Sequence, residues 1–402
     1  MFFESYSIFI YILCFVLVYN ISKIFTTNSF VRNFIIFGGN LFVLLLLVKE
    51  HTLIVLAVLS LLIYSIGKLL QKQKRGVLLG VSIVFLIILF SIRNYELIQN
   101  LLNKSFFSIL NAPVLSVQKI GLSYILFRYI HWLVESYKQN IPQSNFFTFL
   151  NYIVFFPTIL AGPIDTYSNF HYWIENKRVR YQKSLFFAGI TRILIGSFKT
   201  LAITPIIINF ATDYTLLLPT HSPLSAILLS LLAYSLYIYI DFSGYSDIAI
   251  GTAYLVGIKT HENFNNPYFS SSLSDFWKRW HITFSNFLKL YVFKPLINFF
   301  NKIFNPKHRL FISILTYVLT FSICGLWHGD KVNFLYWGIW HGVGLSINKI
   351  WDIKIKTKSD FYKSKFYYFL SGVTTYSFVT VGWMFFHYTH EELIVIFNLI
   401  KP

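Results

Sequence analysis

The stretch Ser274–Leu290 reads S-D-F-W-K-R-W-H-I-T-F-S-N-F-L-K-L and places a histidine, two tryptophans and three basic residues in an otherwise apolar chain. Ser274 or Asp275 is expected to cap a helix, because both side chains accept hydrogen bonds from the first backbone amides. In one continuous helix, the positions i, i+3, i+4 and i+7 of one face are Trp277, Trp280, His281 and Phe284. The histidine is therefore expected on an aromatic face, where an imidazole needs a partner.

Composition identifies the chain as a polytopic membrane protein. Of its 402 residues, 55% are hydrophobic and 12% are charged, and the mean hydropathy is +0.59; soluble domains carry roughly 25% charged residues. The net charge of +18 is typical of basic loops that contact anionic lipids rather than nucleic acid. The chain has only two cysteines, both in apolar segments, and this number excludes a disulfide framework.

Apolar runs of membrane-spanning length recur along the chain. They lie near residues 5–24, 33–48, 52–70, 77–97, 186–210, 225–257, 310–327, 332–350 and 366–387. The basic loop Lys68–Arg75 is expected on the cytoplasmic side. With short and re-entrant segments included, we predict an all-α polytopic bundle of about 11–13 membrane helices.

The chain is expected to form one membrane domain, 1–402, since it contains no 20–50-residue repeat. Residues 1–100 carry almost no polar chemistry within their apolar runs and are interpreted as scaffold helices. Residues 111–350 carry the polar motifs and are interpreted as the catalytic core. Residues 351–402 are expected to form a C-terminal loop and helix.

Polar residues interrupt the apolar runs from residue 121 onward. Arg128 and Glu135 lie on one face of an apolar helix and are predicted to pair, because an unpaired charge is costly in a membrane. Two prolines and a glycine predict a turn or re-entrant loop over Phe155–Tyr167. The sequence D-F-S-G-Y-S-D at 241–247 is expected to interrupt the run 225–257, where Gly244 and Gly251 permit a break or a close helix approach.

Two histidines, His281 and His328, stand out as candidates for chemistry. His328 ends an apolar run in Trp327-His328-Gly329, and a third histidine, His341, lies in the same Trp-His-Gly triplet further along the chain. A zinc site takes three or four ligands, often at short local spacing. The spacing of His281, His328 and His341 does not support such a site, so no metal is expected. A neutral imidazole in an apolar cavity can take a proton from a hydroxyl group. No Gly-x-Ser-x-Gly elbow is present, and we therefore interpret His281 and His328 as a pair for direct transfer.

Five segments together resemble the membrane-bound O-acyltransferase family. They are G-P-I-D at 162–165, D-F-S-G-Y-S-D at 241–247, G-I-K-T-H-E-N-F-N-N-P at 257–267, S-D-F-W-K-R-W-H-I-T-F-S at 274–285 and W-H-G at 327–329. The resemblance implies that His328 is the essential histidine and His281 the second one, and that many helices surround a tunnel through the bilayer. With it, we predict that the following residues contact substrate: Trp277, Trp280, Asp241, Ser243, Asp247, Asn263, Asn265, Trp327 and Asp165. Lys278 and Arg279 are interpreted as interfacial anchors or contacts for an acidic partner.

The motifs point to two branches of this family. G-P-I-D and G-I-K-T-x-E-N-F-N are similar to the D-alanyl transferases of teichoic-acid modification, which take D-alanine from the phosphopantetheine thioester of a small carrier protein. S-G-Y-S-D and C-G-L-W-H-G are closer to the alginate and peptidoglycan O-acetyltransferases. A Gly-Gly-Asn-Arg sequence common in those enzymes is absent, and Lys294–Asn298 stands in its place.

The resemblance therefore implies an acyltransferase of the bacterial cytoplasmic membrane, with no bound cofactor. It would move D-alanyl from the thioester of a small acidic acyl-carrier protein to a hydroxyl of a cell-envelope polymer such as teichoic acid. In this hypothesis His328 acts as the base, and His281 holds or polarises the donor carbonyl. The alternatives are O-acetylation of an exported polysaccharide or peptidoglycan, and a transporter or flippase, which would need matching broken helices in both halves of the chain.

Overall fold

The computed structural model describes residues 14–22, 28–48, 50–94, 121–176, 182–211, 213–329, 331–355 and 364–400. Among these residues the regular structure is helical and no strand occurs, which confirms the predicted all-α class. Much of the first expected span, near 5–24, and much of the loop before the last one lie outside the described residues. The chain divides into two compact units, Met1–Gly196 with Tyr245–His261, and Ser197–Gly244 with Glu262–Pro402. The single-domain organisation stays a prediction.

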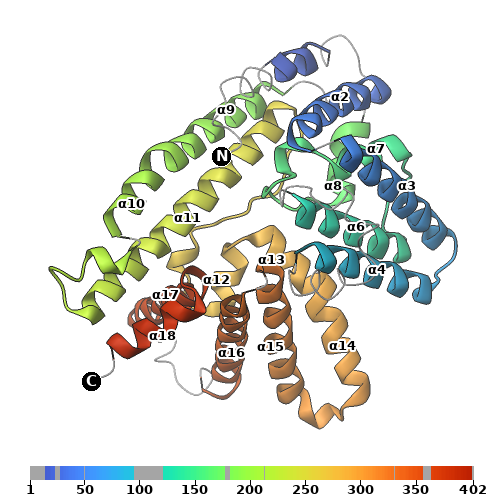
Figure 1. Cartoon of the computed structure of the whole chain (residues 1–402). Coiled ribbons are helices and arrows are strands. Elements are labelled where there is room, and N and C mark those ends of the chain that lie inside the picture. The colour runs from blue at the N-terminus through green and yellow to red at the C-terminus, as the bar shows by residue number, and fades with distance from the viewer. Residues whose placement is uncertain are drawn as a thin grey trace, which may run out of the picture. The chain divides into compact units, whose positions relative to one another are not determined.

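In the first unit, several helices pack around α6. Its helices are α2 (Ser29–Leu47), α3 (Glu50–Lys72), α4 (Gly76–Asn94), α6 (Leu122–Tyr137), α7 (Phe146–Ile153), α8 (Tyr167–Glu175) and nearly all of α9 (Lys183–Phe198). Helix α6 packs against α3 and α4 (Figure 1). The core there is formed by Tyr129, Trp132 and Phe149, whose side chains are 1% exposed or less.

The Arg128 side chain of α6 donates hydrogen bonds to backbone carbonyl groups rather than pairing with a carboxylate. Its Nη1 donates to the carbonyl oxygens of Tyr152 and Ile153, over 2.9 and 2.8 Å. The predicted Arg128–Glu135 pair is therefore wrong, and Glu135 instead pairs with Lys138 at 2.9 Å. The reason is that α7 ends at this point, where its last carbonyls lack helical partners and need donors.

The turn predicted over Phe155–Tyr167 is confirmed. Between α7 and α8 the only regular structure is a 3₁₀ turn, η2 (Phe156–Thr158). Asn40 of α2 holds this segment, because its Oδ1 accepts the N–H of Phe156 at 2.9 Å and its Nδ2 donates to Oδ1 of Asn151 at 3.1 Å. Buried side-chain amides thus satisfy backbone groups that a helix would satisfy internally.

The second unit contains the residues with the candidate chemistry. Its helices are α10 (Thr204–Ala211), most of α11 (Pro223–Leu255), α12 (Leu273–Arg279), α13 (Ile282–Leu288), α14 (Lys294–Ile303), α15 (Arg309–His328), α16 (Val332–Lys354), α17 (Lys365–His387) and α18 (His390–Leu399). Two π-helical turns, η3 (Lys199–Ile203) and η6 (Lys289–Phe293), precede α10 and α14. Helices α15 and α16 run side by side (Figure 1).

Helix α11 is continuous over 33 residues, so the predicted interruption at D-F-S-G-Y-S-D is wrong. One of its carboxylates is accommodated by an ion pair, because Asp247 Oδ1 lies 2.6 Å from Arg192 Nη1 of α9. The predicted close approach does occur at Gly251, where a Cβ would lie 2.7 Å from the carbonyl oxygen of Gly189 in α9. A small-residue contact and an ion pair therefore join these two helices.

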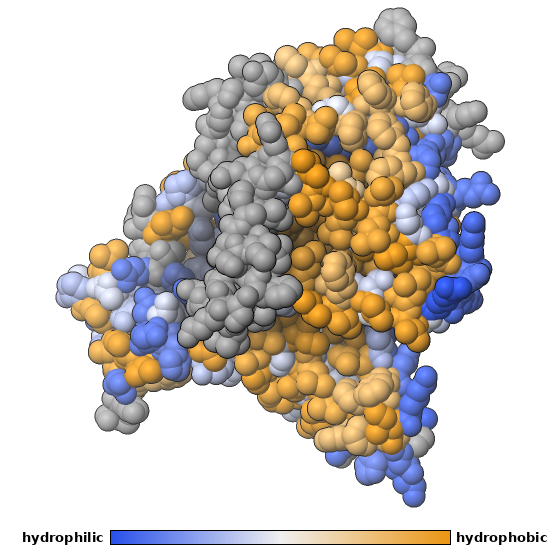
Figure 2. All heavy atoms as spheres, turned by 45° about the vertical axis from the view of Figure 1, so that its right-hand side comes forward, coloured by the Kyte–Doolittle hydropathy of each residue, from blue (hydrophilic) through white to orange (hydrophobic). Residues whose placement is uncertain are grey.

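Six helices in the described part of the chain are long and apolar enough to cross a membrane. They cover Ser29–Leu47, Thr52–Lys72, Lys183–Ile208, Pro223–Leu255, Arg309–His328 and Lys365–His387. Helices α3 and α4 also expose large apolar side chains, such as Val58 (64%) and Val77 (82%), and Figure 2 shows a broad hydrophobic surface with a hydrophilic border. The multi-pass membrane architecture is confirmed, and the count of 11–13 segments stays a prediction.

Candidate active site

The predicted helix over Ser274–Leu290 is split at His281. Helix α12 begins after its N-cap Ser272, not Ser274 or Asp275, and ends at Arg279; α13 begins at Ile282. His281 itself adopts the left-handed conformation, with φ 42° and ψ 53°. Non-glycine residues rarely occupy this region, and those that do are held by their surroundings. The one-helix prediction was therefore wrong at the residue that matters most.

The loop before α12 holds the break in place. The N–H of Asn265 donates to the carbonyl of Arg279 at 2.9 Å, and the N–H of Ile282 donates to the carbonyl of Asn263 at 2.9 Å. These two bonds flank His281 on both sides in sequence. They satisfy backbone groups that a continuous helix would have paired internally.

Asn263 also orients the His281 ring. His281 Nδ1 lies 3.0 Å from Asn263 Oδ1, which also accepts the N–H of Thr283 at 3.4 Å and its Oγ1–H at 2.9 Å. A backbone N–H can only donate, so the shared atom is the amide oxygen. Nδ1 of His281 therefore carries the proton, and the neutral ring presents its lone pair at Nε2.

His281 is 4% exposed and is enclosed by aromatic side chains. The Phe242 ring meets it edge to face with centroids 4.8 Å apart, and the Phe284 ring lies at 5.0 Å. Burial, with a smaller contribution from His328, lowers the pKa of His281 to about 3. The imidazole is therefore neutral at physiological pH.

His328 is the last residue of α15 and is only partly buried. Five aromatic rings surround it at centroid distances of 4.5 to 6.5 Å: Phe284, Trp327, Phe334, Trp337 and Phe386. Phe284 is thus a common neighbour of His281 and His328. The structure brings the two predicted catalytic histidines into one aromatic environment.

Glycines in α15 and α16 set the position of His328. A Cβ at Gly338 would overlap the carbonyl oxygen of Phe321, and a Cβ at Gly325 would overlap that of Phe334. The two backbones therefore approach as closely as small residues allow. As a result Trp337 of α16 stands edge to face against His328, with centroids 5.1 Å apart.

Trp277 of α12 and Trp280, the residue after the end of that helix, are buried behind rings that surround the two histidines. Trp277 is 7% exposed and Trp280 is 4% exposed. Trp277 contacts Trp337 at 5.9 Å, and Trp280 contacts Trp383 at 5.1 Å. Trp327 lies against Phe284 at 4.5 Å. These residues therefore shape the surroundings of the two histidines.

The remaining predicted residues of the second unit have varied surroundings. Oδ1 of Asp241 is buried and has no hydrogen-bond partner in the described residues. Ser243 Oγ, in contrast, accepts a hydrogen bond from Lys199 Nζ at 3.3 Å. The side chain of Asn265 is exposed. Of the predicted partner contacts, Lys278 is exposed. Arg279 forms an ion pair with Asp275 at 3.0 Å.

Asp165 and Asp247 belong to the first unit, and each is engaged with residues of that unit. Asp165 is 4% exposed and lies 2.8 Å from His261 Nδ1. This hydrogen bond raises the pKa of His261 above its ordinary value. Asp247 pairs with Arg192, as described above. A contact of either carboxylate with substrate stays a prediction.

Sequence reasoning missed four residues that line the histidine pair. Phe242 comes from α11, Phe334 and Trp337 come from α16, and Phe386 comes from α17; each contacts His281 or His328. Two of them carried a local signal: Phe242 is the second residue of D-F-S-G-Y-S-D, and Trp337 precedes the second Trp-His-Gly triplet. No spacing along the chain connects Phe334 or Phe386 with the motifs.

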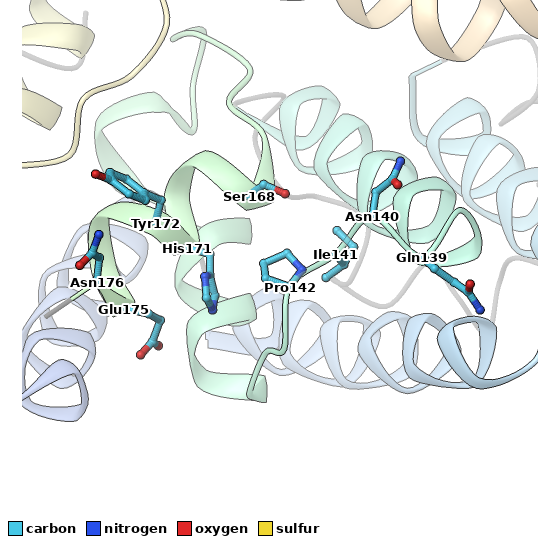
Figure 3. Close-up of a pocket in the computed structure, with 9 residues that line it drawn as sticks. All are labelled: Gln139, Asn140, Ile141, Pro142, Ser168, His171, Tyr172, Glu175 and Asn176. Atoms are coloured by element: carbon cyan, nitrogen blue, oxygen red, sulfur yellow. The ribbon is translucent and has the colours of Figure 1, made fainter.

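Two further features of the described residues concern metal binding and a surface pocket. Among the described residues, no group of three or more His, Cys, Asp or Glu could hold a metal ion. A surface pocket of about 600 Å³ lies in the first unit between α8 and the loop after α6 (Figure 3). It is lined by Gln139, Asn140, Ile141, Pro142, Ser168, His171, Tyr172, Glu175 and Asn176. It contains none of the predicted site residues.

Comparison with known proteins identifies the class. Residues 32–389 match the membrane-bound O-acyltransferase family, and the chain belongs to that family. It is 32% identical over 279 residues to the teichoic acid D-alanyltransferase of Bacillus subtilis (strain 168). The matched region covers 66% of this chain and 68% of that protein.

Acetyl-transferring relatives are about as similar. The chain is 32% identical over 319 residues to the peptidoglycan O-acetyltransferase of Helicobacter pylori (strain ATCC 700392 / 26695), covering 73% of the chain and 58% of that protein. It is 31% identical over 268 residues to a probable alginate O-acetylase of Pseudomonas putida, covering 66% and 52%. The chain thus spans about half the length of the alginate relative. The predicted membrane acyltransferase class is confirmed, whereas these identities do not separate the two acyl groups.

Proposed function

We propose that this protein transfers D-alanyl from the thioester of an acidic carrier protein to a hydroxyl of a cell-envelope polymer such as teichoic acid. The observation that carries the proposal is the pair His281 and His328 beside the common ring of Phe284. Relatives named for transfer to teichoic acid, alginate and peptidoglycan support a polymer as the acceptor.

The transfer needs one base and a dry site. The acceptor hydroxyl oxygen attacks the thioester carbonyl carbon, the C–O bond forms and the C–S bond breaks. His328 takes the hydroxyl proton and delivers it to the leaving thiolate, so that the charges balance. The rings around His328 exclude water, which would otherwise compete with the polymer as the acceptor.

The tautomer of His281 changes the role that the sequence suggested for it. Polarising the donor carbonyl requires a proton on Nε2, whereas the bond to Asn263 supports a proton on Nδ1. We assign Nε2 to accept a hydrogen bond from the ammonium group of D-alanyl. The neighbouring rings of Phe242 and Phe284 also suit a cation. Acetyl carries no such group, so this contact would distinguish a D-alanyl donor from an acetyl donor.

The decisive experiment supplies both donors to one preparation. Purified protein in lipid vesicles receives an acceptor polymer and a carrier protein loaded with D-alanine or with acetate, and mass spectrometry counts the esters. D-Alanyl ester is expected with the wild type and not with His328→Ala, provided that the variant inserts and purifies equally well. Acetyl ester alone would move the protein to the O-acetyltransferase alternative. Equal ester formation by His328→Ala would refute the assigned base.

His281 is tested in the same assay. Gln at position 281 can place an acceptor near the position of Nε2, whereas Phe keeps the ring and removes the acceptor. We expect His281→Gln to retain more D-alanyl transfer than His281→Phe. Equal losses in the two variants would contradict the assigned contact with the ammonium group.

A further inference from the structure

His341 lies in the middle of α16 and is 0% exposed, although no step proposed above uses it. Six aromatic rings surround it: Phe276, Trp277, Phe321, Trp337, Phe378 and Trp383. A polar ring gains little from such a place, because its nitrogens lose their contacts with water. The hydrogen bonds of this imidazole therefore indicate its role.

One hydrogen bond reaches the ring within the described residues. Trp277 Nε1–H donates to His341 Nδ1 over 3.4 Å. An indole nitrogen only donates, so Nδ1 holds the lone pair and the neutral ring carries its proton on Nε2. Nε2 is buried without a hydrogen-bond partner in the described chain. It faces Gly382 of α17, where a Cβ would lie 3.1 Å from it.

Trp337 connects this ring to His328, and Trp277 connects it to the helix that precedes His281. Trp277 belongs to α12, the helix that leads directly into His281. Trp337 lies 5.0 Å from the ring of His341 and 5.1 Å from that of His328. The rings of Trp277, Trp337 and His341 also contact one another. One imidazole therefore touches both Trp337, which contacts His328, and Trp277, which contacts Trp337.

We infer that His341 is a positioning residue for the acyl transfer proposed above. By accepting the N–H of Trp277, it fixes the orientation of that indole, and through Trp337 it fixes the ring of His328. It does not exchange a proton with substrate, because Nδ1 is bonded to Trp277 and Nε2 is enclosed against Gly382. The inference rests on the proposed function and assigns His341 a role that the motifs do not.

Three substitutions separate the hydrogen bond from simple packing. His341→Asn places an oxygen near the position of Nδ1 and keeps an acceptor for Trp277. His341→Gln places its amide near the position of Nε2 and loses that acceptor. His341→Phe fills the same space with no polar atom.

We expect His341→Asn to keep most of the wild-type kcat. His341→Gln and His341→Phe should lose roughly tenfold to a hundredfold in kcat, because small displacements of reacting groups have effects of that size. The KM for the carrier donor and the pH profile should stay unchanged in all three variants. Higher activity for the Phe variant than for the Asn variant would show that His341 acts only by filling space. A shifted pH profile would show that His341 takes part in the chemical step. Either result overturns the inference.

A measurement independent of activity distinguishes this inference from the proposed function. Thermal unfolding midpoints of the wild type, Trp277→Phe, His341→Phe and the double variant form a cycle that reports the coupling of the two side chains. We expect the effects of the two changes to be clearly less than additive. His341→Asn should behave like the wild type in its response to Trp277→Phe. Additive effects refute the bond even if D-alanyl transfer is found, whereas coupling without transfer leaves the bond standing and refutes only the assigned reaction.

Discussion

His281 Nδ1 donates a 3.0 Å hydrogen bond to Asn263 Oδ1, a residue 18 positions earlier in the chain. The same oxygen accepts two hydrogen bonds from Thr283, so its identity and the tautomer of His281 are fixed together. Asn263 was predicted to contact substrate. The structure gives it a different contact, in which it orients a candidate catalytic ring.

Replacing Asn263 by Ala should reduce kcat by about 10- to 100-fold, if it matches the loss typical when a group that orients a metal-ligating histidine is removed. The loss follows because the Nδ1–H of His281 no longer has an acceptor and the ring can turn. Thr283→Val is the matched control, since it removes a second donor to the same oxygen and leaves the histidine bond intact. Steady-state transfer with a D-alanyl donor measures both, and an Asn263→Ala variant with wild-type kcat would contradict the assigned orientation.

Asn263→Asp should change the pH dependence rather than the geometry. Its carboxylate still accepts from Nδ1, but the new negative charge favours the imidazolium and raises the pKa of His281 from about 3. Because the neutral form is the one required, transfer by this variant should fall at a higher pH than transfer by the wild type as the medium is acidified. A pH series of kcat for both proteins measures the shift, and identical acid limbs would refute it.

Acid should also destabilise the fold through His281. Its pKa in the folded protein, about 3, lies below its ordinary value of about 6.5. The folded state therefore resists protonation, and its stability is greatest above pH 6.5 and falls as the pH drops toward 3. Unfolding midpoints measured at pH 7.5 and pH 5 should differ less in His281→Phe than in the wild type. An unchanged difference would show that other groups account for the acid sensitivity.

His261 should contribute a dependence of the opposite sign. Its hydrogen bond to Asp165 raises its folded pKa above the ordinary value, so this stabilisation is complete below pH 6.5 and is lost as the pH rises through the folded pKa. The His261 side chain is 54% exposed, and solvent screening keeps the effect small. Between pH 6.5 and pH 9 the unfolding midpoint of the wild type should fall slightly relative to that of His261→Gln. A parallel response of the two proteins would contradict this.

Sequence alone predicted the helical class and most spans, because hydropathy depends on local residues, and the motifs singled out two histidines that share the neighbour Phe284. It failed where a residue's partner lies far away in the chain. The Arg128–Glu135 pair looked favourable on one helix, yet the carbonyls at the end of α7 hold Arg128. The helix break at His281 depends on the loop at Asn263, and helical spacing carries no signal of that pairing.

The seam between α15 and α16 should tolerate no side chain at Gly338. A Cβ there overlaps the carbonyl oxygen of Phe321, so Gly338→Ala should separate the helices at a cost of about 1–3 kcal/mol and displace Trp337 from His328. Gly80 of α4 is the control, because nothing lies within 4 Å of an added Cβ. Gly80→Ala should be neutral or slightly stabilising. Thermal unfolding and D-alanyl transfer measure both variants, and equal behaviour would contradict the close contact.

Asp247, which the motif suggested as a substrate contact, forms an ion pair with Arg192 at 2.6 Å. If the pair holds α9 against α11, Asp247→Asn should lower the stability by roughly 1–3 kcal/mol, less than a fully buried pair would lose, and leave KM unchanged. The double variant Arg192→Leu with Asp247→Leu should recover part of the loss, since no uncompensated charge remains. A higher KM with unchanged stability in Asp247→Asn would instead return this carboxylate to the substrate. Unfolding midpoints and donor titrations on the same preparations decide between the two.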